Sequence, residues 1–237
     1  DIVYEDENIL LVDKPVGMVV HEDESGDSDT LINRIKSYLY HKGEYRPENE
    51  LSFAPALCNR IDRNTCGIVI AAKNAESLRI LNQKIRDREL TKLYLCIACG
   101  KVTPDSATLT AYLEKNSDTN TVKISDKKTK SNLTIKTKYK VIAYNGENSL
   151  LKVDLLTGRT HQIRAHLAYI GHALLGDGKY GNNKLNKKYG FKYQALCSYE
   201  LHFKFTTDAG CLSYLDGKCF KAKAPDFVKM FGSNIKL

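Results

Sequence analysis

The chain has 237 residues, of which 42% are hydrophobic and 27% are charged. These proportions are ordinary for a globular protein and exclude a disordered or fibrous chain, and no apolar stretch reaches the roughly 18 residues that a membrane-spanning helix needs. The formal net charge of +8 indicates a polyanionic partner, because a positive surface attracts nucleic acids and other acidic molecules.

The first elements predicted along the chain are two short strands and a helix. The strands lie around residues 2–4 and 9–12, and a Lys-Pro-Val-Gly turn ends the second. The helix follows between Ser28 and Gly43, with Ser28 or Asp29 as its N-cap and Gly43 at its end. Its apolar stripe consists of Leu31, Ile35 and Tyr38.

A second strand-helix pair comes next. The apolar run Gly-Ile-Val-Ile-Ala-Ala at residues 67–72 is typical of a buried strand. Asn74 is expected to cap the helix after it, which carries Leu78, Leu81 and Ile85 on one face.

Residues 90–156 contain a succession of segments with strand patterns, and Asn145-Gly146 is a hairpin signal between the last two. We expect these strands to be antiparallel. A helix is predicted from near Gly158 to Gly171, burying Ile163, Leu167 and Ile170. A strand pair at residues 194–205 and 211–215 and a helix after Pro225 complete the chain. This order predicts an α+β fold with a mixed, largely antiparallel central sheet and a few flanking helices.

Two lysine-rich runs carry much of the positive charge, at residues 123–140 and 178–193. Each run alone is equally compatible with a solvated surface and with a nucleic-acid contact. Together they favour nucleic acid.

The seven cysteines are an odd number in a chain without a secretory signal, which predicts reduced thiols and a cytoplasmic location. Cys96 and Cys99 form a CxxC pair within a strand, so their side chains point to opposite faces. No second ligand pair stands nearby. We therefore expect small buried side chains and no metal site.

Asp62 stands between Arg60 and Arg63, just before the buried strand. Neighbouring cations favour the ionised form of a carboxyl group, so Asp62 is expected to be a carboxylate at neutral pH, suited to act as a nucleophile or an electrostatic partner. The alternative is an ordinary ion pair in a surface turn, which contributes little stability. Residues 60–63 alone favour this alternative.

A second polar group lies at the start of the predicted helix near Gly158. Its members share one ten-residue segment and are Arg159, Thr160, His161, Gln162, Arg164 and His166. The two histidines are five residues apart and do not share a helical face, which disfavours zinc ligation. Arg164 can bind a buried carboxylate through the planar, two-pronged guanidinium group. The alternative for the whole group of six residues is an exposed polar helix face.

The motifs Asn-Arg-Ile-Asp-Arg-Asn, at residues 59–64, and Gly-Arg-Thr-His-Gln-Ile-Arg-Ala-His-Leu, at residues 158–167, together resemble the signature pair of the RluA-type family of RNA pseudouridine synthases. The similarity continues in the opening strands and Lys-Pro turn, in the tyrosine strand at residues 92–102, in the loop at residues 174–181 and in the strand at residues 194–203. The resemblance implies the catalytic fold of that family, with residues 1–237 as a single catalytic domain and no RNA-binding domain ahead of it in this chain.

The resemblance also implies residue roles. Asp62 matches the catalytic aspartate, Tyr94 the tyrosine that packs against the uracil ring, and Arg164 the basic partner of the aspartate. Arg60 matches the arginine that enters the RNA helix when the uridine leaves it. The remaining residues expected to contact RNA are Arg63, Arg159, Thr160, His161, Gln162, His166 and Lys179.

The expected activity is isomerisation of specific uridines in RNA to pseudouridine by a monomeric protein. Ribosomal RNA of the large subunit is the favoured substrate and transfer RNA the second. No cofactor or metal is expected, because the reaction involves no redox change. Two alternatives stay open: a non-catalytic RNA-binding or ribosome-assembly protein on the same scaffold, and a nucleoside or glycan hydrolase, for which neither motif supplies the second carboxylate usually needed.

Overall fold

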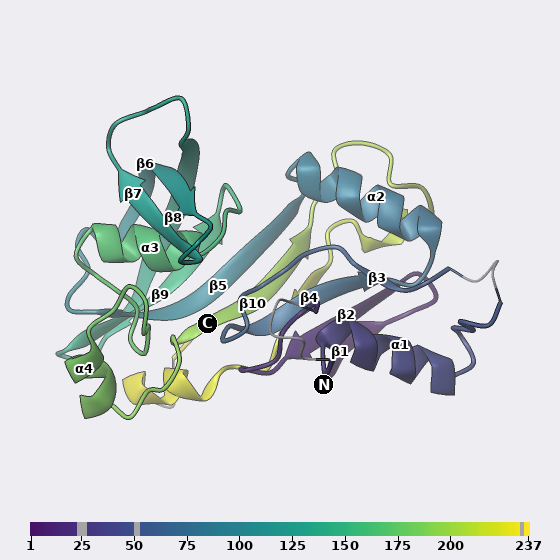
Figure 1. Cartoon of the computed structure of the whole chain (residues 1–237), viewed down its shortest axis with the longest axis horizontal. Helices are drawn as coiled ribbons and strands as arrows, with labels where there is room; N and C mark the ends of the chain where they lie inside the picture. Colours follow the sequence, from purple (N-terminus) through teal and green to yellow (C-terminus); the bar gives the residue numbers. More distant parts are fainter. Residues whose placement is uncertain (23–27, 50–52, 233–234) are drawn as a thin grey trace. The chain divides into compact units, whose positions relative to one another are not determined.

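The computed structural model describes residues 1–22, 28–49, 53–232 and 235–237 (Figure 1). The chain forms two compact units, each assembled from two segments. The first unit contains residues 1–92 and 198–223, and the second contains residues 93–197 and 224–237. Strands β5 (Leu90–Cys99) and β10 (Leu196–Phe203) each contribute residues to both units.

The first unit is built on β1 (Ile2–Glu5), β2 (Ile9–Lys14) and β4 (Cys66–Ala72), which pair antiparallel in that order. The short strand β3 (Ala56–Leu57) also pairs with β4, and β11 (Cys219–Lys221) pairs with β10. Gly67 has φ +105°, and a Cβ atom there would lie 2.2 Å from the carbonyl oxygen of Ser198. Only glycine permits this close approach of two backbones.

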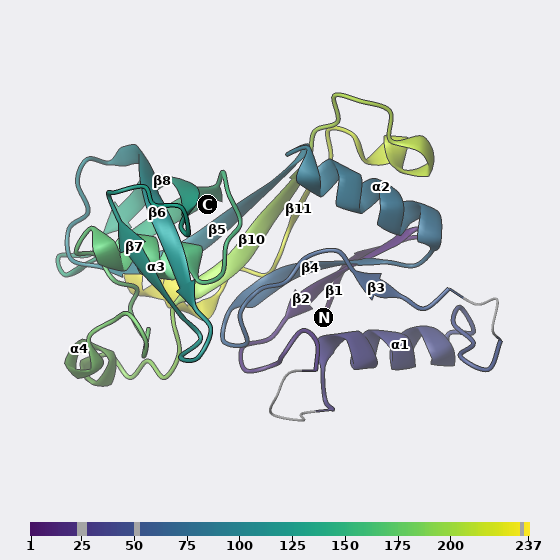
Figure 2. The same ribbon diagram turned by 45° about the horizontal axis from the view of Figure 1, so that its top comes forward.

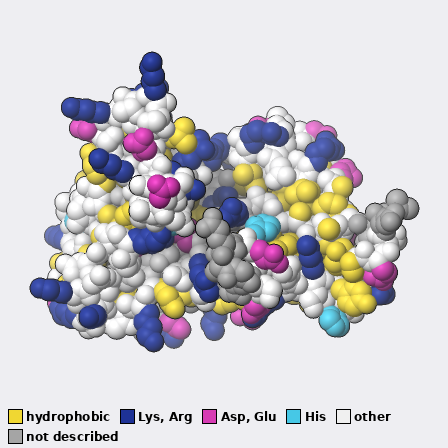
Figure 3. Space-filling model, viewed as in Figure 1, with side chains coloured by type: hydrophobic (Ala, Val, Ile, Leu, Met, Phe, Trp, Pro, Cys, Tyr) yellow, Lys and Arg dark blue, Asp and Glu magenta, His cyan; other side chains and the backbone are white. Residues whose placement is uncertain are grey.

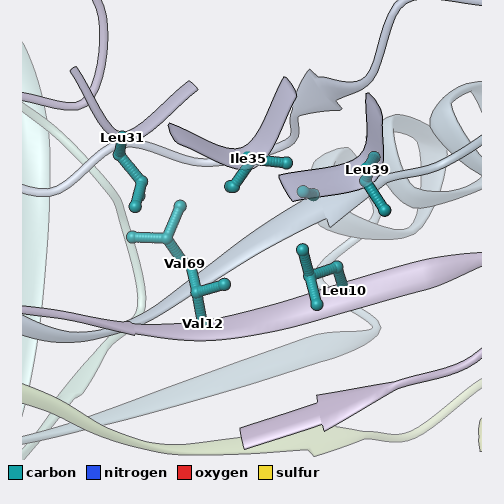
Figure 4. Packing of buried hydrophobic residues seen from close by; sticks show 7 residues of the cluster. Leu10, Val12, Leu31, Ile35, Leu39 and Val69 are labelled. Atoms are coloured by element: carbon teal, nitrogen blue, oxygen red, sulfur yellow. The ribbon is translucent and has the colours of Figure 1, made fainter. Parts of the chain in front are cut away.

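Helix α1 (Leu31–His41) covers one face of these strands. Figure 4 shows Leu31, Ile35 and Leu39 of the helix pointing toward Leu10, Val12 and Val69 of β2 and β4. The predicted stripe was wrong at one position, because Tyr38 is exposed and donates its hydroxyl to Glu5 Oε2 at 2.7 Å, while Leu39 is buried. The N-cap is Thr30 rather than Ser28 or Asp29, since Thr30 Oγ1 accepts from the Asn33 N–H.

Helix α2 (Ala75–Arg86) lies on the other side of the strands from α1 (Figure 2). Asn74 caps it as predicted, accepting from the Ser77 N–H at 2.8 Å. The predicted stripe again needs correction: Ile80 and Leu81 are buried, whereas Leu78 and Ile85 are only half-buried. The buried face is therefore rotated toward Ile80, beside the 3₁₀ helix η1 (Gly210–Leu215).

The second unit is an antiparallel array in the strand order β5, β9, β8, β6, β7. Besides β5, these strands are β6 (Ser106–Asn116), β7 (Thr121–Ser125), β8 (Leu133–Tyr144) and β9 (Asn148–Leu155). All were predicted, and the turn between β8 and β9 falls at Asn145-Gly146, where Gly146 has φ +94°. Cys96 is buried in β5, and burial raises the pKa of its thiol.

Helix α3 (Gln162–Tyr169) begins four residues later than predicted. His161 has a left-handed backbone with φ +52°, which a helix cannot include, and residues 158–161 form a loop instead. The lysine-rich segment also contains a helix that sequence analysis missed, α4 (Asn183–Lys188), capped by Asn182. Near the C-terminus the 3₁₀ helix η2 (Asp226–Phe231) packs Phe227 and Phe231 against buried residues of β5 and its neighbours.

The predicted strand at residues 211–215 was wrong. These residues belong to η1, and the partner of β10 is β11, which follows it. The prediction of an α+β fold with a mixed, largely antiparallel sheet and few helices is confirmed. Among the described residues, no helix combines the length and the hydropathy that crossing a membrane requires.

Candidate active site

The loop that carries Asp62 is fixed at its first residues by β4. The Cys58 N–H donates to the Ile70 carbonyl at 2.8 Å, and Asn59 Oδ1 accepts from the Ile70 N–H at 2.8 Å. The Asn59 side chain thereby continues the pairing of β3 with β4. Ile61 packs against the core beneath α1, so the residue before Asp62 is anchored in apolar surroundings.

The second half of the loop turns sharply into β4. The Thr65 N–H donates to the Asp62 carbonyl at 3.0 Å, which closes a turn of four residues. Asp62 is half-buried, while Arg60 and Arg63 are exposed to solvent. The structure thus brings Arg60, Asp62 and Arg63 together in one short loop with the carboxylate closest to the protein interior.

A buried lysine ties this loop to the turn after β2. The Lys14 ammonium donates to the carbonyl oxygens of Pro15 at 2.9 Å, Met18 at 2.8 Å and Arg63 at 2.9 Å. Arg63 Nε in turn donates to the Gly17 carbonyl at 2.9 Å, and the Gly17 N–H donates to the Arg63 carbonyl. These bonds connect residues 14–18 and 62–65 into one rigid support.

Burial lowers the pKa of Lys14 to about 8, and the negative charge of Asp62 opposes this shift. Sequence analysis missed Lys14 as a site residue. The available signal was a lysine at the end of a strand that begins with four apolar residues, followed by proline.

In the second unit, Arg164 on α3 forms a buried ion pair with Asp177. Its Nε lies 2.7 Å from Oδ2 and its Nη2 lies 2.9 Å from Oδ1, the two-pronged geometry that fixes a guanidinium plane. Arg164 is 6% exposed and Asp177 is fully buried. Burial alone would raise the pKa of Asp177, but the bonds and charge of Arg164 outweigh it and hold that pKa below its usual value.

The loop after α3 is organised around the same carboxylate. The N–H groups of Lys179 and Tyr180 donate to Asp177 Oδ1 at 2.9 and 3.1 Å. The Tyr180 ring lies 5.3 Å from the Arg164 guanidinium carbon, and its hydroxyl accepts from the Val122 N–H and lies 2.9 Å from His161 Nδ1. Arg164 is therefore held by a carboxylate and an aromatic face, and sequence analysis did not single out Asp177.

Two residues with predicted RNA contacts lie inside the second unit. Gln162 Nε2 donates to the Lys136 carbonyl and to Thr137 Oγ1, both at 3.0 Å, and its Oε1 accepts from the Arg159 N–H. His166 is 1% exposed, with Nδ1 2.9 Å from Thr137 Oγ1, and burial lowers its pKa to about 4. Gln162 holds the start of α3 against β8, and His166 holds the last turn of α3 against the same strand.

The other predicted residues differ in exposure. Arg159, Thr160 and Lys179 are exposed, and His161 is half-buried beside Tyr180. Tyr94 is 6% exposed and pairs across the sheet with Val153 of β9. Asp62 belongs to the first unit, whereas Tyr94 and Arg164 belong to the second.

The first lysine-rich run forms one face of β8. Ile135, Thr137 and Tyr139 are buried, and the residues that alternate with them are exposed. These exposed residues include Lys136, Lys138 and Lys140. Figure 3 shows further Lys and Arg side chains projecting at the end of the β6–β7–β8 ribbon. The run is a positively charged strand face with a spacing of about 7 Å between lysines.

Residues 8–169 match the family model described as RNA pseudouridylate synthase. The chain belongs to this family. It is 39% identical over 210 residues to an uncharacterised RNA pseudouridine synthase of Mycoplasma genitalium, covering 85% of this chain and 62% of that protein. It is 34% identical over 181 residues to the ribosomal large subunit pseudouridine synthase D of Borreliella burgdorferi, covering 76% of this chain and 54% of that protein.

A solved structure of the same fold is the human RNA pseudouridylate synthase domain containing 4, with a TM-score of 0.74 at 19% identity over 97% of this chain and 90% of that one. This similarity concerns the fold. The chain spans between half and two thirds of the length of the two curated bacterial relatives described above.

Proposed function

We propose that this pseudouridylate synthase family member isomerises uridines in RNA to pseudouridine, with Asp62 as the catalytic carboxylate. The observation that carries the proposal is the Asp62 loop, which lies inside the region matched to the family model and is braced by Asn59 on one side and by Lys14 on the other. A surface ion pair needs no buried lysine beneath it. A carboxylate that must meet a reacting atom needs a fixed position.

The reaction moves the ribose from one ring atom of uracil to another. The bond between the anomeric carbon and a ring nitrogen breaks, the base turns, and a bond to a ring carbon forms. That carbon loses its proton and the freed ring nitrogen takes one up, so the product is an isomer of the substrate. Asp62 acts while ionised, either by attacking the anomeric carbon or by removing a ribose proton to give a glycal.

A uridine stacked within RNA must leave the helix to reach a protein carboxylate, at a cost of a few kcal/mol. We assign to Arg60, which is exposed at the loop, the filling of the vacated stack. Tyr94 is assigned to the uracil ring and Arg164 to the partnership with Asp62. In this assignment Asp177 is a positioning residue, because it fixes the plane of the Arg164 guanidinium.

RNA backbone contacts are assigned to exposed groups of each unit and to the half-buried His161. They are Arg63 in the first unit and Arg159, Thr160, His161, Lys179 and the β8 lysines in the second. A lysine face of this kind neutralises phosphates without reading sequence. Gln162 and His166 act inside the protein in this proposal, by holding α3 to β8.

Large-subunit ribosomal RNA is the proposed substrate, with transfer RNA as the second. The relative from Borreliella burgdorferi, whose name specifies the ribosomal large subunit, supports the first. We propose that the protein acts as a monomer in the cytoplasm. It uses no cofactor in this proposal, since the isomerisation involves no change of oxidation state.

The test incubates the purified chain with unmodified large-subunit ribosomal RNA and, separately, with unmodified transfer RNA, followed by chemical labelling of pseudouridine and sequencing. Pseudouridine at defined positions supports the proposal and identifies the substrate. Binding without modification of either RNA would favour the non-catalytic RNA-binding alternative. Release of free uracil would favour a hydrolase.

A further inference from the structure

The hairpin of β10 and β11 in the first unit carries a second group of reactive side chains. His202 and Cys219 are direct partners across the two strands, and Glu200 stands two residues before His202, on the same face. Among the residues that the structure describes, these three form the single group of histidine, cysteine and acidic side chains close enough to share a metal ion. Their ligand atoms lie within 4.8 Å of one another.

Two of the spacings between the ligand atoms can be compared with those of a zinc site. His202 Nε2 lies 2.9 Å from Glu200 Oε2 and 3.5 Å from Cys219 Sγ. In a tetrahedral zinc site, ordinary metal–ligand distances place nitrogen and sulfur ligands about 3.6 Å apart and nitrogen and oxygen ligands about 3.3 Å apart. The observed nitrogen–sulfur spacing already fits, and the nitrogen–oxygen spacing needs an opening of only about 0.4 Å.

The geometry differs from that of a nucleophilic triad. In a triad the carboxylate contacts one ring nitrogen of histidine and the nucleophile contacts the other, so that a proton can be relayed. Here both Glu200 and Cys219 face the same nitrogen, Nε2. Oxygen, nitrogen and sulfur donors that point to one centre form a ligand set rather than a relay.

Burial and charge suit a metal site with one open position. Glu200 is 4% exposed, whereas the His202 side chain is 38% exposed and Cys219 lies at the surface. Lys221 lies 3.0 Å from Glu200 Oε1, which orients the carboxylate and leaves Oε2 directed at His202. An ion entering from solvent meets three protein ligands, and water completes the coordination.

We propose that Glu200, His202 and Cys219 bind a Zn²⁺ ion. The mixed nitrogen, sulfur and oxygen donors match the preference of Zn²⁺, and Mg²⁺ and Ca²⁺ are disfavoured because they require oxygen ligands. Binding displaces the Cys219 thiol proton to solvent. The His202 ring proton shifts from Nε2 to Nδ1, which opens the hydrogen bond to Glu200 Oε2 and leaves the Nε2 lone pair for the ion. The bound ion crosslinks β11 to β10 and takes no part in the RNA reaction.

The test titrates untagged, metal-free protein with Zn²⁺ against a chromogenic chelator and, in parallel, with Co²⁺ to observe the thiolate-to-metal charge-transfer absorption. We expect one equivalent of Zn²⁺ per chain and a charge-transfer band with Co²⁺. Cys219→Ser and His202→Asn should each weaken Zn²⁺ binding at least tenfold and remove the rise in melting temperature that Zn²⁺ causes. The matched controls Cys211→Ser and His41→Asn, which alter the same residue types elsewhere in the first unit, should bind like the parent.

The proposal is overturned if the parent protein binds no stoichiometric Zn²⁺, if the Co²⁺ complex lacks the thiolate band, or if Cys219→Ser and His202→Asn bind as tightly as the controls. A melting temperature in metal-free buffer within a few degrees of the parent establishes that Cys219→Ser and His202→Asn are folded, so that a loss of binding reports on the ligands.

Discussion

Replacing Asp177 with asparagine should destabilise the protein strongly, although the two side chains have nearly the same shape. Asp177 is fully buried and accepts two bonds from Arg164, at 2.7 and 2.9 Å, and two from backbone N–H groups. The amide of asparagine keeps one acceptor oxygen and turns an NH₂ group toward a guanidinium that can only donate. The buried Arg164 guanidinium then loses the carboxylate that binds it at two points.

Removing one partner of a buried ion pair costs about 3–5 kcal/mol of unfolding free energy. We expect Asp177→Asn to fall in this range, measured by urea unfolding at pH 7. The matched control is Asp226→Asn, which removes an ion pair with Lys229 at the same 2.7 Å spacing but on the surface, and should change the unfolding free energy by less than about 1 kcal/mol.

The double variant Arg164→Met, Asp177→Leu separates charge from packing. Because it removes both charges at once, it should be more stable than Asp177→Asn alone. A loss of less than about 1 kcal/mol in Asp177→Asn would refute the reasoning, since it would mean that the Arg164 charge does not depend on Asp177.

Three further predictions concern both units. Lys14→Met removes the buried ammonium that donates to three carbonyl oxygens and should reduce the unfolding free energy by about 3 kcal/mol in urea unfolding. A loss below about 1 kcal/mol would contradict the proposed brace. The pKa of His166 is lowered from 6.5 to about 4, so the unfolded chain takes up a proton that the folded chain refuses, and the unfolding free energy should fall between pH 6.5 and 4; His166→Asn should flatten this slope and His41→Asn should not. Gly67→Ala should prevent accumulation of folded protein, because its Cβ would lie 2.2 Å from a backbone oxygen. The control Gly146→Ala shares a positive φ but has open space around the Cβ, so it should reduce the unfolding free energy by about 1 kcal/mol. Equal effects of the two variants on expression and melting temperature would contradict the steric argument.

Strands β6, β7 and β8 of the second unit could be predicted because each has one buried face. In β8 the buried Ile135, Thr137 and Tyr139 alternate with exposed lysines, and this period of two is visible in the sequence. The buried faces of the helices were predicted less accurately, because they depend on how each helix is rotated about its own axis. In α1 the choice between Tyr38 and Leu39 was decided by a hydrogen bond from Tyr38 to Glu5, which no local pattern indicates.

The start of α3 could not be predicted from the sequence for a different reason. Residues 158–161 have a sequence compatible with a helix, but the left-handed backbone of His161 and the bond from the Arg159 N–H to Gln162 Oε1 form a loop there. A contact between a side chain and the backbone thus overrides the helical preference of the segment.

The candidate site could be predicted where a motif marks it. Asp62, Tyr94 and Arg164 were recognised from their surroundings in the sequence. Lys14 and Asp177 were not, because a single charged residue in a sequence usually lies at the surface, and burial shows only in three dimensions. Each is buried with its charge satisfied by several partners, the arrangement that makes a buried charge tolerable.

The central claim is that Asp62 carries out the isomerisation. Its most direct test is the rate of pseudouridine formation in ribosomal RNA by Asp62→Asn, compared with the parent and with Asp118→Asn, which changes an exposed aspartate in the turn between β6 and β7. We predict that Asp62→Asn binds RNA with an affinity like that of the parent but forms no detectable pseudouridine, while Asp118→Asn retains full activity. Pseudouridine formation by Asp62→Asn at a rate near that of the parent would contradict the account.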